Sequence, residues 1–368
     1  MIIGVLKEVK DNESRVAMTP EGVKKFIRAG HRVLIDNNAG IGSGISNEQY
    51  KEAGAEILEN KNEICKKSEL ILKIKEPVPA EYNIFSPGQM LFTFFHFASN
   101  RQLTEAMINA KVTCIAYETV ETADGEVPLL APMSEIAGKM APIVAANYLA
   151  KPAGGKGVLA SSAGNVKPAR FVILGGGNAG QAAATVALGM GADVTIIEKI
   201  QARIEELKKI FTGASFALAT PENVATNVKQ ADVVIGTVHV PGARAPKLVS
   251  GEMVKKMEKG SVIVDIAIDQ GGSIETSRPT THSNPVYVEE GVIHYCVTNM
   301  PGVFPRTSTF ALTSATISYA LELADKGTKA FENSELLKGL NIYKGKITNK
   351  GVAEAHNLPY TDPKQLLE

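Results

Sequence analysis

Short apolar runs alternate with amphipathic stretches from residue 1 to about residue 128. Thr19 and Pro20 stand at a predicted helix start and Gly30 follows its last apolar position, which predicts a helix ending at Ala29. The glycine-rich stretch 39–44 predicts a loop. The apolar runs predict strands at residues 2–7, 32–36, 70–74, 90–95 and 112–116. This alternation predicts a βα domain with its own parallel sheet.

The middle of the chain resumes the alternation after a long helical stretch from Pro132 to Lys151. A second helix is expected to end at Ile210, and a third to run from Ser308 to Lys326, before a polar tail from Phe331 to Glu368. Apolar runs predict strands at residues 171–174, 193–197, 232–238, 261–268 and 293–298. We expect the middle part to be inserted, with the C-terminal helix returning to the first domain.

Three glycines break the strand at 171–174 and mark the chain's clearest motif. Gly175, Gly177 and Gly180 have the G-x-G-x-x-G spacing, and a small-residue helix follows them. These glycines allow a tight turn, close approach of a pyrophosphate and close helix–strand packing. The next strand ends at Glu198, whose carboxylate can accept both ribose hydroxyls and repel a 2′-phosphate. A bare glycine turn is the alternative, but the strand, helix and acid around the motif favour a dinucleotide site.

The pattern places the chain in the α/β class with two domains. An inserted Rossmann dinucleotide-binding domain is expected at residues 129–306. A flavodoxin-like or Rossmann-like substrate domain is expected at 1–128, completed by 307–368.

Composition and charge exclude several classes of partner. Thirty-nine basic residues balance 39 acidic ones, so no net field favours nucleic acid or an anionic membrane. The longest apolar stretch is far short of the ~20 residues that span a bilayer. The first residues lack the pattern of a signal peptide. The three cysteines have no metal-like spacing and fit a reducing compartment, so a cytoplasmic protein without a metal site is expected.

Four residues near predicted strand ends could carry chemistry. Asp269 directly follows the run 261–268, at the predicted C-terminal end of the strand. It could orient or deprotonate a water, although an Asp before two glycines can simply start a turn. His96 suits proton transfer near neutral pH, but it could equally be a core histidine. Lys75 and Arg15 could bind a carboxylate; alternatively, they are a solvated lysine and a surface-loop arginine. Asp265 is expected to be a structural hydrogen-bonding residue within its strand.

The order of several motifs carries a resemblance to a known family. In chain order they are Lys7-Glu-x-x-x-x-Glu-x-Arg15-Val-Ala, Lys73-x-Lys75-Glu-Pro, Phe92-Thr-x-x-His96, Pro132-Met-Ser-Glu-Ile-Ala-Gly, Val240-Pro-Gly-Ala-x-Ala-Pro-Lys, Val264-Asp-x-Ala-Ile-Asp269-Gln-Gly and Asn299-Met-Pro-Gly. Over nearly its whole length the chain resembles the NAD-dependent L-alanine dehydrogenases, which are relatives of the transhydrogenase α subunit. The resemblance implies oxidative deamination of L-alanine to pyruvate and ammonia, and the reverse reaction.

The resemblance also implies roles for individual residues. Arg15 and Lys75 would bind the substrate carboxylate, Asn299 would also contact substrate, and His96 and Asp269 would handle protons. The positions that would bind NAD are Ser134, Gly175, Gly177, Asn178, Ala179, Gly180, Glu198, Arg203, Thr220, Val238, His239, Ile266, Ala267, Ile268, Asp269, Arg278, Val297, Thr298, Asn299 and Met300. Family members are commonly homohexamers, so the expected partners are small-molecule substrates and further copies of the chain.

Three alternatives remain open at this point. The chain could be a transhydrogenase-like NAD-binding subunit, a dehydrogenase of another amino acid such as lysine or saccharopine, or a cofactor-binding protein with an inert site. Glu198 stands where the family usually has Asp, and Lys199 and Arg203 close to it could host the phosphate of NADP.

Overall fold

The computed structural model describes residues 1–238 and 245–367, and the chain divides into two compact units. Unit 1 comprises Met1–Met133 and Gly302–Glu368, and unit 2 comprises Ser134–Pro301. The divisions fall within helix α5 (Ala131–Leu149) and the 3₁₀ turn η7 (Met300–Val303), whereas the sequence pattern put them at 128/129 and 306/307. In the described part of the chain, no helix is both long enough and apolar enough to span a membrane.

Unit 1 contains a mixed sheet of eight strands in the order β15-β14-β6-β5-β4-β1-β2-β3. Its six N-terminal strands are parallel, and β14 joins β6 antiparallel. The parallel part therefore has the 3-2-1-4-5-6 order of a Rossmann fold, not the flavodoxin-like order. The strands are β1 (Ile2–Val5), β2 (Arg32–Asp36), β3 (Glu56–Leu58), β4 (Leu70–Leu72), β5 (Met90–Thr93), β6 (Thr113–Ala116), β14 (Leu340–Tyr343) and β15 (Lys346–Ile347).

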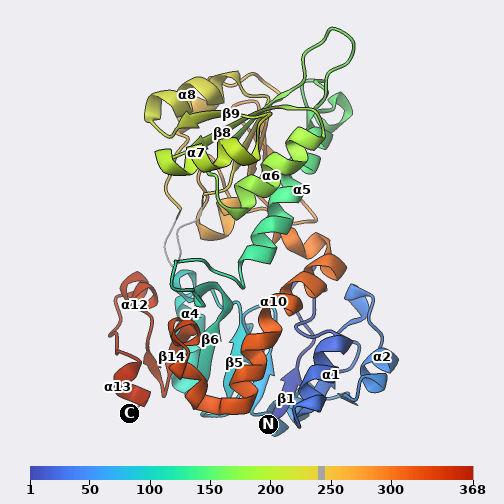
Figure 1. Ribbon diagram of the computed structural model, residues 1–368, viewed down its shortest axis with the longest axis vertical. Coiled ribbons are helices and arrows are strands. Elements are labelled where there is room, and N and C mark those ends of the chain that lie inside the picture. The colour runs from blue at the N-terminus through green and yellow to red at the C-terminus, as the bar shows by residue number, and fades with distance from the viewer. Residues whose placement is uncertain (239–244, 368) are drawn as a thin grey trace. The chain divides into compact units, whose positions relative to one another are not determined.

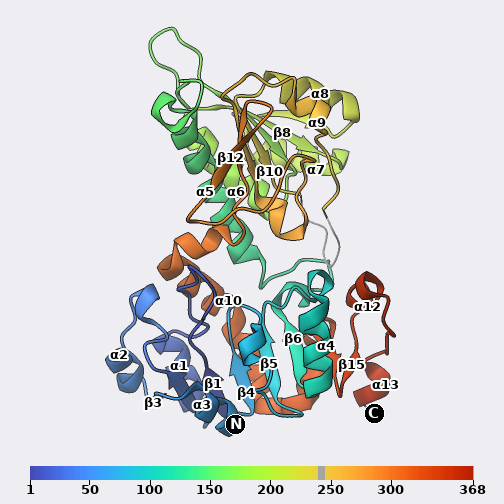
Figure 2. The same ribbon diagram turned by 180° about the vertical axis from the view of Figure 1, so that it is seen from behind.

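Helices cover both faces of this sheet (Figures 1 and 2). Apolar side chains of α3 and α4 share a core with alternate residues of the central strands, whereas α1 and α10 lie side by side on the other face. Thr19 caps α1 by accepting from the Gly22 N–H, as its sequence predicts. The helices are α1 (Pro20–Arg28), α2 (Asn47–Glu52), α3 (Lys61–Lys67), α4 (Arg101–Ala110), α10 (Pro305–Lys326), α11 (Ser334–Gly339), α12 (Lys350–His356) and α13 (Lys364–Leu367).

Unit 2 contains a seven-stranded sheet in the order β12-β13-β11-β10-β7-β8-β9. All its pairs are parallel except the edge pair β12–β13, so this unit too has Rossmann order. The strands are β7 (Arg170–Leu174), β8 (Asp193–Glu198), β9 (Ser215–Leu218), β10 (Val233–Gly236), β11 (Val262–Asp265), β12 (Val286–Glu289) and β13 (Val292–Tyr295). The helices are α5, α6 (Asn178–Gly189), α7 (Gln201–Ile210), α8 (Pro221–Gln230) and α9 (Gly251–Val254).

The apolar run of β7 shows why a buried parallel strand loses the usual alternation. Phe171 and Ile173 pack with α5 and α6 on one face, and Val172 and Leu174 pack with α8 and α9 on the other. Because helices cover both faces, each position along the strand must be apolar.

Two expectations about the elements were wrong. The run 261–268 was expected to be one strand, but β11 ends at Asp265 and the 3₁₀ turn η6 (Ile266–Gln270) follows. The loop predicted at 39–44 is confirmed; it connects β2 to α2 and contains the 3₁₀ turn η1 (Ile41–Ser43). The polar tail, for which no strand was predicted, supplies β14 and β15, so the sheet of unit 1 is mixed.

Candidate active site

The candidate residues of unit 1 follow the carboxyl ends of three neighbouring strands. The chain order reverses between β1 and β4, and ligands of doubly wound sheets bind at such switch points. Arg15 lies on the segment after β1, Lys75 lies just beyond β4, and His96 lies just beyond β5. The strands are shorter than predicted, so Lys75 and His96 stand on the connecting segments and not on the strands themselves.

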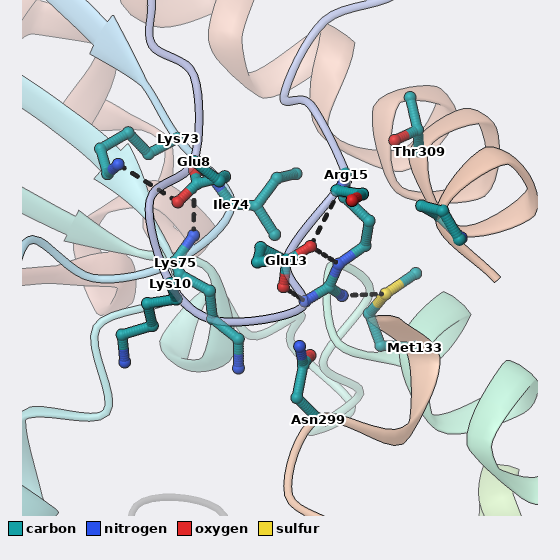
Figure 3. A network of polar contacts seen from close by, with 12 residues as sticks. Glu8, Lys10, Glu13, Arg15, Lys73, Ile74, Lys75, Met133, Asn299 and Thr309 are labelled. Atoms are coloured by element: carbon teal, nitrogen blue, oxygen red, sulfur yellow. Dashed lines mark hydrogen bonds and ion pairs between the residues drawn. The ribbon is translucent and has the colours of Figure 1, made fainter. Parts of the chain in front are cut away.

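Arg15 is not the surface-loop arginine of the alternative interpretation, since it is only 2% exposed. Its Nε and Nη2 bind the two carboxylate oxygens of Glu13 at 2.7 and 2.5 Å, and its Nη1 donates to Met133 Sδ at 3.1 Å (Figure 3). Glu13 therefore occupies the side-on fork of the guanidinium. A substrate carboxylate that binds Arg15 bidentately must use the end-on fork, Nη1 and Nη2.

A second buried carboxylate, Glu8, organises the segment that carries Lys75. Glu8 Oε1 accepts from the Ile74 N–H at 2.7 Å and the Lys75 N–H at 3.3 Å, while Oε2 pairs with Lys73 Nζ at 3.2 Å (Figure 3). Burial raises the pKa of Glu8, and the Lys73 ammonium opposes this effect. Burial by itself lowers the pKa of Lys73, but Glu8 and Glu81 outweigh it, so the lysine pKa is raised and the side chain stays charged.

Lys75 itself differs from its buried neighbour Lys73. Within the described residues, no hydrogen bond or ion pair holds the Lys75 ammonium, although its backbone is fixed by Glu8. Lys73, which is 0% exposed, has its charge balanced within the protein. Of these two lysines, Lys75 is therefore the one with a charge available to a substrate carboxylate.

His96 has an unusual backbone conformation for a non-glycine residue. Its φ and ψ of 51° and 40° lie in the left-handed region, where strain of about 1–3 kcal/mol needs support from the surroundings. Glu118 gives that support by accepting from the Phe95 N–H at 3.2 Å and the His96 N–H at 2.6 Å. Ser99 donates through both its N–H and its Oγ to the His96 carbonyl.

The His96 ring is oriented by stacking on Phe94, while its two nitrogens stay available to a ligand. It stacks parallel to the Phe94 ring, with centroids 5.9 Å apart, and Phe94 in turn meets Tyr117 edge-on. Neither ring nitrogen of His96 has a hydrogen-bond partner among the described residues. The imidazole is half-buried, which is a suitable state for a group that exchanges protons with a ligand.

The glycine turn of unit 2 has the geometry that the motif predicts. Gly175 has φ +103°, and a Cβ on Gly180 would lie 1.9 Å from the Gly175 carbonyl oxygen, so both positions require glycine. By contrast, a Cβ on Gly177 would meet nothing within 4 Å. Gly177 is the N-cap of α6, and no side chain among the described residues caps this helix. Open space at an uncapped helix N-terminus fits a pyrophosphate.

Glu198 ends β8 and is held by backbone groups. Its carboxylate accepts from the N–H groups of Gly176, Lys199 and Ile200 at 2.9, 2.7 and 3.0 Å. An ionised carboxylate offers about four acceptor positions, so one remains for a ribose hydroxyl. The prediction that Glu198 binds both hydroxyls directly therefore requires one of these backbone bonds to give way.

Asp269 lies on η6 and not at a strand end, which corrects the predicted position. The strand-end residue is Asp265, whose buried carboxylate accepts from Ala267 N, Ser273 N and Ile274 N at 3.2, 2.9 and 3.2 Å. Its structural role is thus confirmed, and burial raises its pKa. The exposed Asp269 accepts from the Asn299 N–H at 3.5 Å. Asn299 has φ 65°, and its carbonyl is held by His282.

The other residues expected to bind NAD are spread over unit 2. Thr220 caps α8 by accepting from Asn223 N, and Arg203 pairs with Glu206 at 2.7 Å. Arg278 is exposed and lies over the Tyr287 ring. Of the remainder, Asn178 and Ala179 begin α6, Ser134 lies on α5, Ile266, Ala267 and Ile268 form η6, Val238 follows β10, and Val297, Thr298 and Met300 follow β13. His239 lies outside the described residues.

Three carboxylates with clear structural roles were not singled out from the sequence. Glu8 and Glu13 are part of the motif that contains Arg15, yet only the arginine was assigned a role. Glu118 follows β6, the neighbour of the strand that precedes His96. An acid two residues from Arg15 is a detectable signal for Glu13, whereas Glu118 could be found only once the order of strands was known.

Together, these observations define a two-domain α/β protein with two Rossmann-ordered sheets, in which Arg15, Lys75 and His96 follow the carboxyl ends of neighbouring strands of unit 1. Residues 4–137 match the family model described as alanine dehydrogenase/PNT, N-terminal domain, and residues 141–350 match alanine dehydrogenase/PNT, C-terminal domain. The chain therefore belongs to the alanine dehydrogenase/PNT family.

Similar proteins support this assignment over the full length. The chain is 54% identical to an alanine dehydrogenase of Methanococcus maripaludis and 48% identical to alanine dehydrogenase 2 of Staphylococcus aureus strain USA300, with 100% of each chain covered. A solved L-alanine dehydrogenase has a TM-score of 0.92 at 43% identity, covering 97% of this chain and 99% of its own. A transhydrogenase from Sinorhizobium meliloti has a TM-score of 0.79 at 26% identity, covering 95% and 99%. The protein is an oxidoreductase of the alanine dehydrogenase type.

Proposed function

We propose that this protein interconverts L-alanine, water and NAD⁺ with pyruvate, ammonium, NADH and a proton. The observation that carries the proposal is the 54% identity to an alanine dehydrogenase across the whole of both chains. The arrangement of unit 1 supports it, because the switch point between β1 and β4 is flanked by the segments that bear Arg15 and Lys75.

The glycine turn supports NAD as the cofactor. The open space at Gly177 and the uncapped start of α6 suit a pyrophosphate, and Glu198 has an acceptor position for a ribose hydroxyl. When bound, NAD⁺ supplies the acceptor for the hydride that leaves alanine Cα. Glu198 would repel the 2′-phosphate of NADP, and the nearby Arg203 is already paired with Glu206, which favours NAD.

In this proposal, Arg15 and Lys75 bind and orient the substrate carboxylate. Arg15 is fixed by Glu13, and the pair is close to neutral as a unit. The charge that balances the substrate carboxylate therefore comes mainly from Lys75. Lys75 also faces the oxo or imino group, where an ammonium stabilises developing negative charge.

His96 and Asp269 are the two proton-handling residues. The substrate amine must lose a proton before Cα can become an imine carbon, and a water must then be deprotonated to add to that carbon. The resulting carbinolamine expels ammonia after its nitrogen is protonated, which leaves pyruvate. The unbonded imidazole nitrogens of His96 and the exposed carboxylate of Asp269 suit these transfers. Asn299, whose N–H lies against Asp269, is proposed to contact the substrate.

The two units are proposed to divide the work. The proposed substrate domain, residues 1–128 and 307–368, lies within unit 1, and the proposed NAD-binding domain, residues 129–306, includes the whole of unit 2. The family resemblance supports a homohexamer, and the three free, buried cysteines fit a reducing cytoplasm. Light scattering coupled to size-exclusion chromatography measures the oligomeric state directly.

A transhydrogenase-like subunit is the second candidate, supported by the likeness to the Sinorhizobium meliloti structure. One assay separates the two: reduced-cofactor formation by the purified protein across a panel of amino acids, with NAD⁺ and with NADP⁺. The proposal predicts turnover with L-alanine and NAD⁺ and much less with lysine, saccharopine or NADP⁺. Binding of NADH without oxidation of any amino acid would instead favour the transhydrogenase-like function.

A further inference from the structure

The guanidinium of Arg278 is held by an aromatic ring while its charge stays unbalanced. Its Cζ lies 3.8 Å from the centroid of the Tyr287 ring, which is close cation–π geometry. Among the described residues, no ion pair or side-chain hydrogen bond engages this exposed guanidinium. The uncharged Tyr287 ring thus restrains the guanidinium without balancing its charge, so the charge is available to an anionic ligand.

Two hydrogen bonds fix the hydroxyl of Tyr287 in place. Its hydroxyl accepts from the Arg278 N–H at 2.8 Å and donates to the Thr276 carbonyl at 2.7 Å. The ring therefore contacts the guanidinium while the hydroxyl binds the backbone of the same residue. Tyr287 lies on the edge strand β12, so this arrangement links the edge of the sheet to the segment that bears Arg278.

A third layer lies under the tyrosine ring. His294 is the antiparallel partner of Tyr287 on β13, and the two rings stack with centroids 5.0 Å apart and planes 19° apart. His294 is 0% exposed, and its Nδ1 and Nε2 bind Val292 O at 3.0 Å and Thr276 Oγ1 at 2.8 Å. Burial lowers the pKa of His294, so the imidazole is neutral near pH 7 and adds no positive charge beneath Arg278.

We infer that Tyr287 is a positioning residue for the cofactor, whose stacked ring holds the Arg278 guanidinium in place to meet the anionic dinucleotide. This inference rests on the proposed function and on the contact with NAD that the family resemblance implies for Arg278. A guanidinium that is already oriented loses less side-chain freedom on binding than a mobile one, so it binds an anion more tightly.

A purely structural role for Tyr287 makes a different prediction. If the ring only stabilised β12 against β13, its loss would weaken cofactor binding whether or not Arg278 were present. If it acts through Arg278, its loss matters only while the guanidinium is there. A double-mutant cycle distinguishes the two, because it isolates the coupling between neighbouring residues.

The experiment measures the Kd of NADH by isothermal titration calorimetry on the full-length protein. Tyr287→Leu and Tyr287→Phe are each made in the wild-type and in the Arg278→Ala background. Val288→Ala serves as a control, since Val288 is the next residue of β12 and is 63% exposed. Thermal unfolding of each variant identifies any that does not fold.

We expect Tyr287→Leu to weaken NADH binding about twofold to fivefold, the range of an exposed cation–π contact. Tyr287→Phe keeps the ring and loses only the hydroxyl, so we expect a smaller loss of about twofold. Neither change should have an effect beyond that of Arg278→Ala when added to it. The KM for pyruvate at saturating NADH should stay at the wild-type value.

Wild-type affinity in Tyr287→Leu, or the same fold loss in both backgrounds, would overturn the inference. If the leucine variant does not fold, Tyr287→Phe carries the same comparison between backgrounds. A wild-type protein that fails to bind NADH would refute the proposed function instead, so the two failures are distinguishable.

Discussion

Two glycines three residues apart in the dinucleotide turn should respond in opposite ways to one added methyl group. At Gly177 an added Cβ meets nothing within 4 Å, and φ is −74°, which any residue adopts. At Gly180 an added Cβ would lie 1.9 Å from the Gly175 carbonyl oxygen. Gly177→Ala should therefore leave the fold intact and obstruct the cofactor, whereas Gly180→Ala should damage the fold itself.

The magnitudes follow from this geometry. Replacing a glycine by alanine stabilises a protein by about 0.4–1 kcal/mol, because alanine lowers the conformational entropy of the unfolded chain. It is a poorer helix N-cap than glycine by a similar amount, so the stability of Gly177→Ala should stay within about 1 kcal/mol of wild type. At Gly180 the contact is shorter than the 3.0 Å below which real Cβ atoms are essentially never found. Helix α6 must move from β7, at a cost of at least about 3 kcal/mol.

Cofactor binding should fall in Gly177→Ala because the methyl group occupies the space that we assign to the pyrophosphate. Strain of about 1–3 kcal/mol from such overpacking corresponds to roughly fivefold to 150-fold weaker binding. Fluorescence titration with NADH and urea unfolding, run on both variants and wild type, measure the two effects separately. Wild-type NADH affinity in a folded Gly177→Ala protein would refute the assignment of this turn as the pyrophosphate site.

Three further predictions concern substrate binding and stability. Arg15→Lys should raise the KM for pyruvate about tenfold with a smaller change in kcat, because lysine cannot bind Glu13 and a substrate carboxylate through two planar forks. An unchanged KM in steady-state assays would leave Arg15 a purely structural role. Asp265→Ala should destabilise the protein by about 2–4 kcal/mol, since it leaves buried N–H groups of Ser273 and Ile274 without an acceptor. An unfolding midpoint equal to that of wild type would contradict this prediction. Burial lowers the pKa of His294 from 6.5, so the unfolded chain binds the proton more readily than the folded protein. The free energy of unfolding should therefore fall as pH drops from 6.5 towards the pKa of His294 in the folded protein, by at most about 1.4 kcal/mol per pH unit. Unfolding midpoints at several pH values should show this slope flattened in His294→Gln, and identical slopes would exclude the histidine as its source.

Much of the fold could be predicted because its signals are local. Thr19, Pro20 and Gly30 mark the ends of α1 through capping and backbone geometry that need no tertiary information. The glycine turn predicted the strand–turn–helix around Gly175 for the same reason. The added strands β14 and β15 could not be predicted in this way. Their polar surroundings resemble a tail, and β14 joins the sheet through a long-range pairing with β6, to which β15 adds as a hairpin partner of β14.

The residue types of the candidate site could be proposed from the sequence, but the residues that hold them in position could not. The end of β11 was placed too late because Ile266 and Ile268 continue an apolar run that the structure folds into a 3₁₀ turn, capped by Asp265. Arg15 was predicted to bind a substrate carboxylate, which stays a prediction. Its burial depends on Glu13, and hydrophobic periodicity carries no signal for a bidentate contact between residues two positions apart. The left-handed backbone of His96 depends on Glu118 from another strand end.

We propose that a hydride passes from Cα of L-alanine to NAD⁺ on this protein. The most direct test is to supply L-alanine deuterated at Cα together with unlabelled NAD⁺, and to determine the mass of the reduced cofactor by mass spectrometry. The NADH should carry one deuterium per molecule and should form together with pyruvate. Reduced cofactor without deuterium, or no reduced cofactor from a protein that binds NADH, would contradict this proposal.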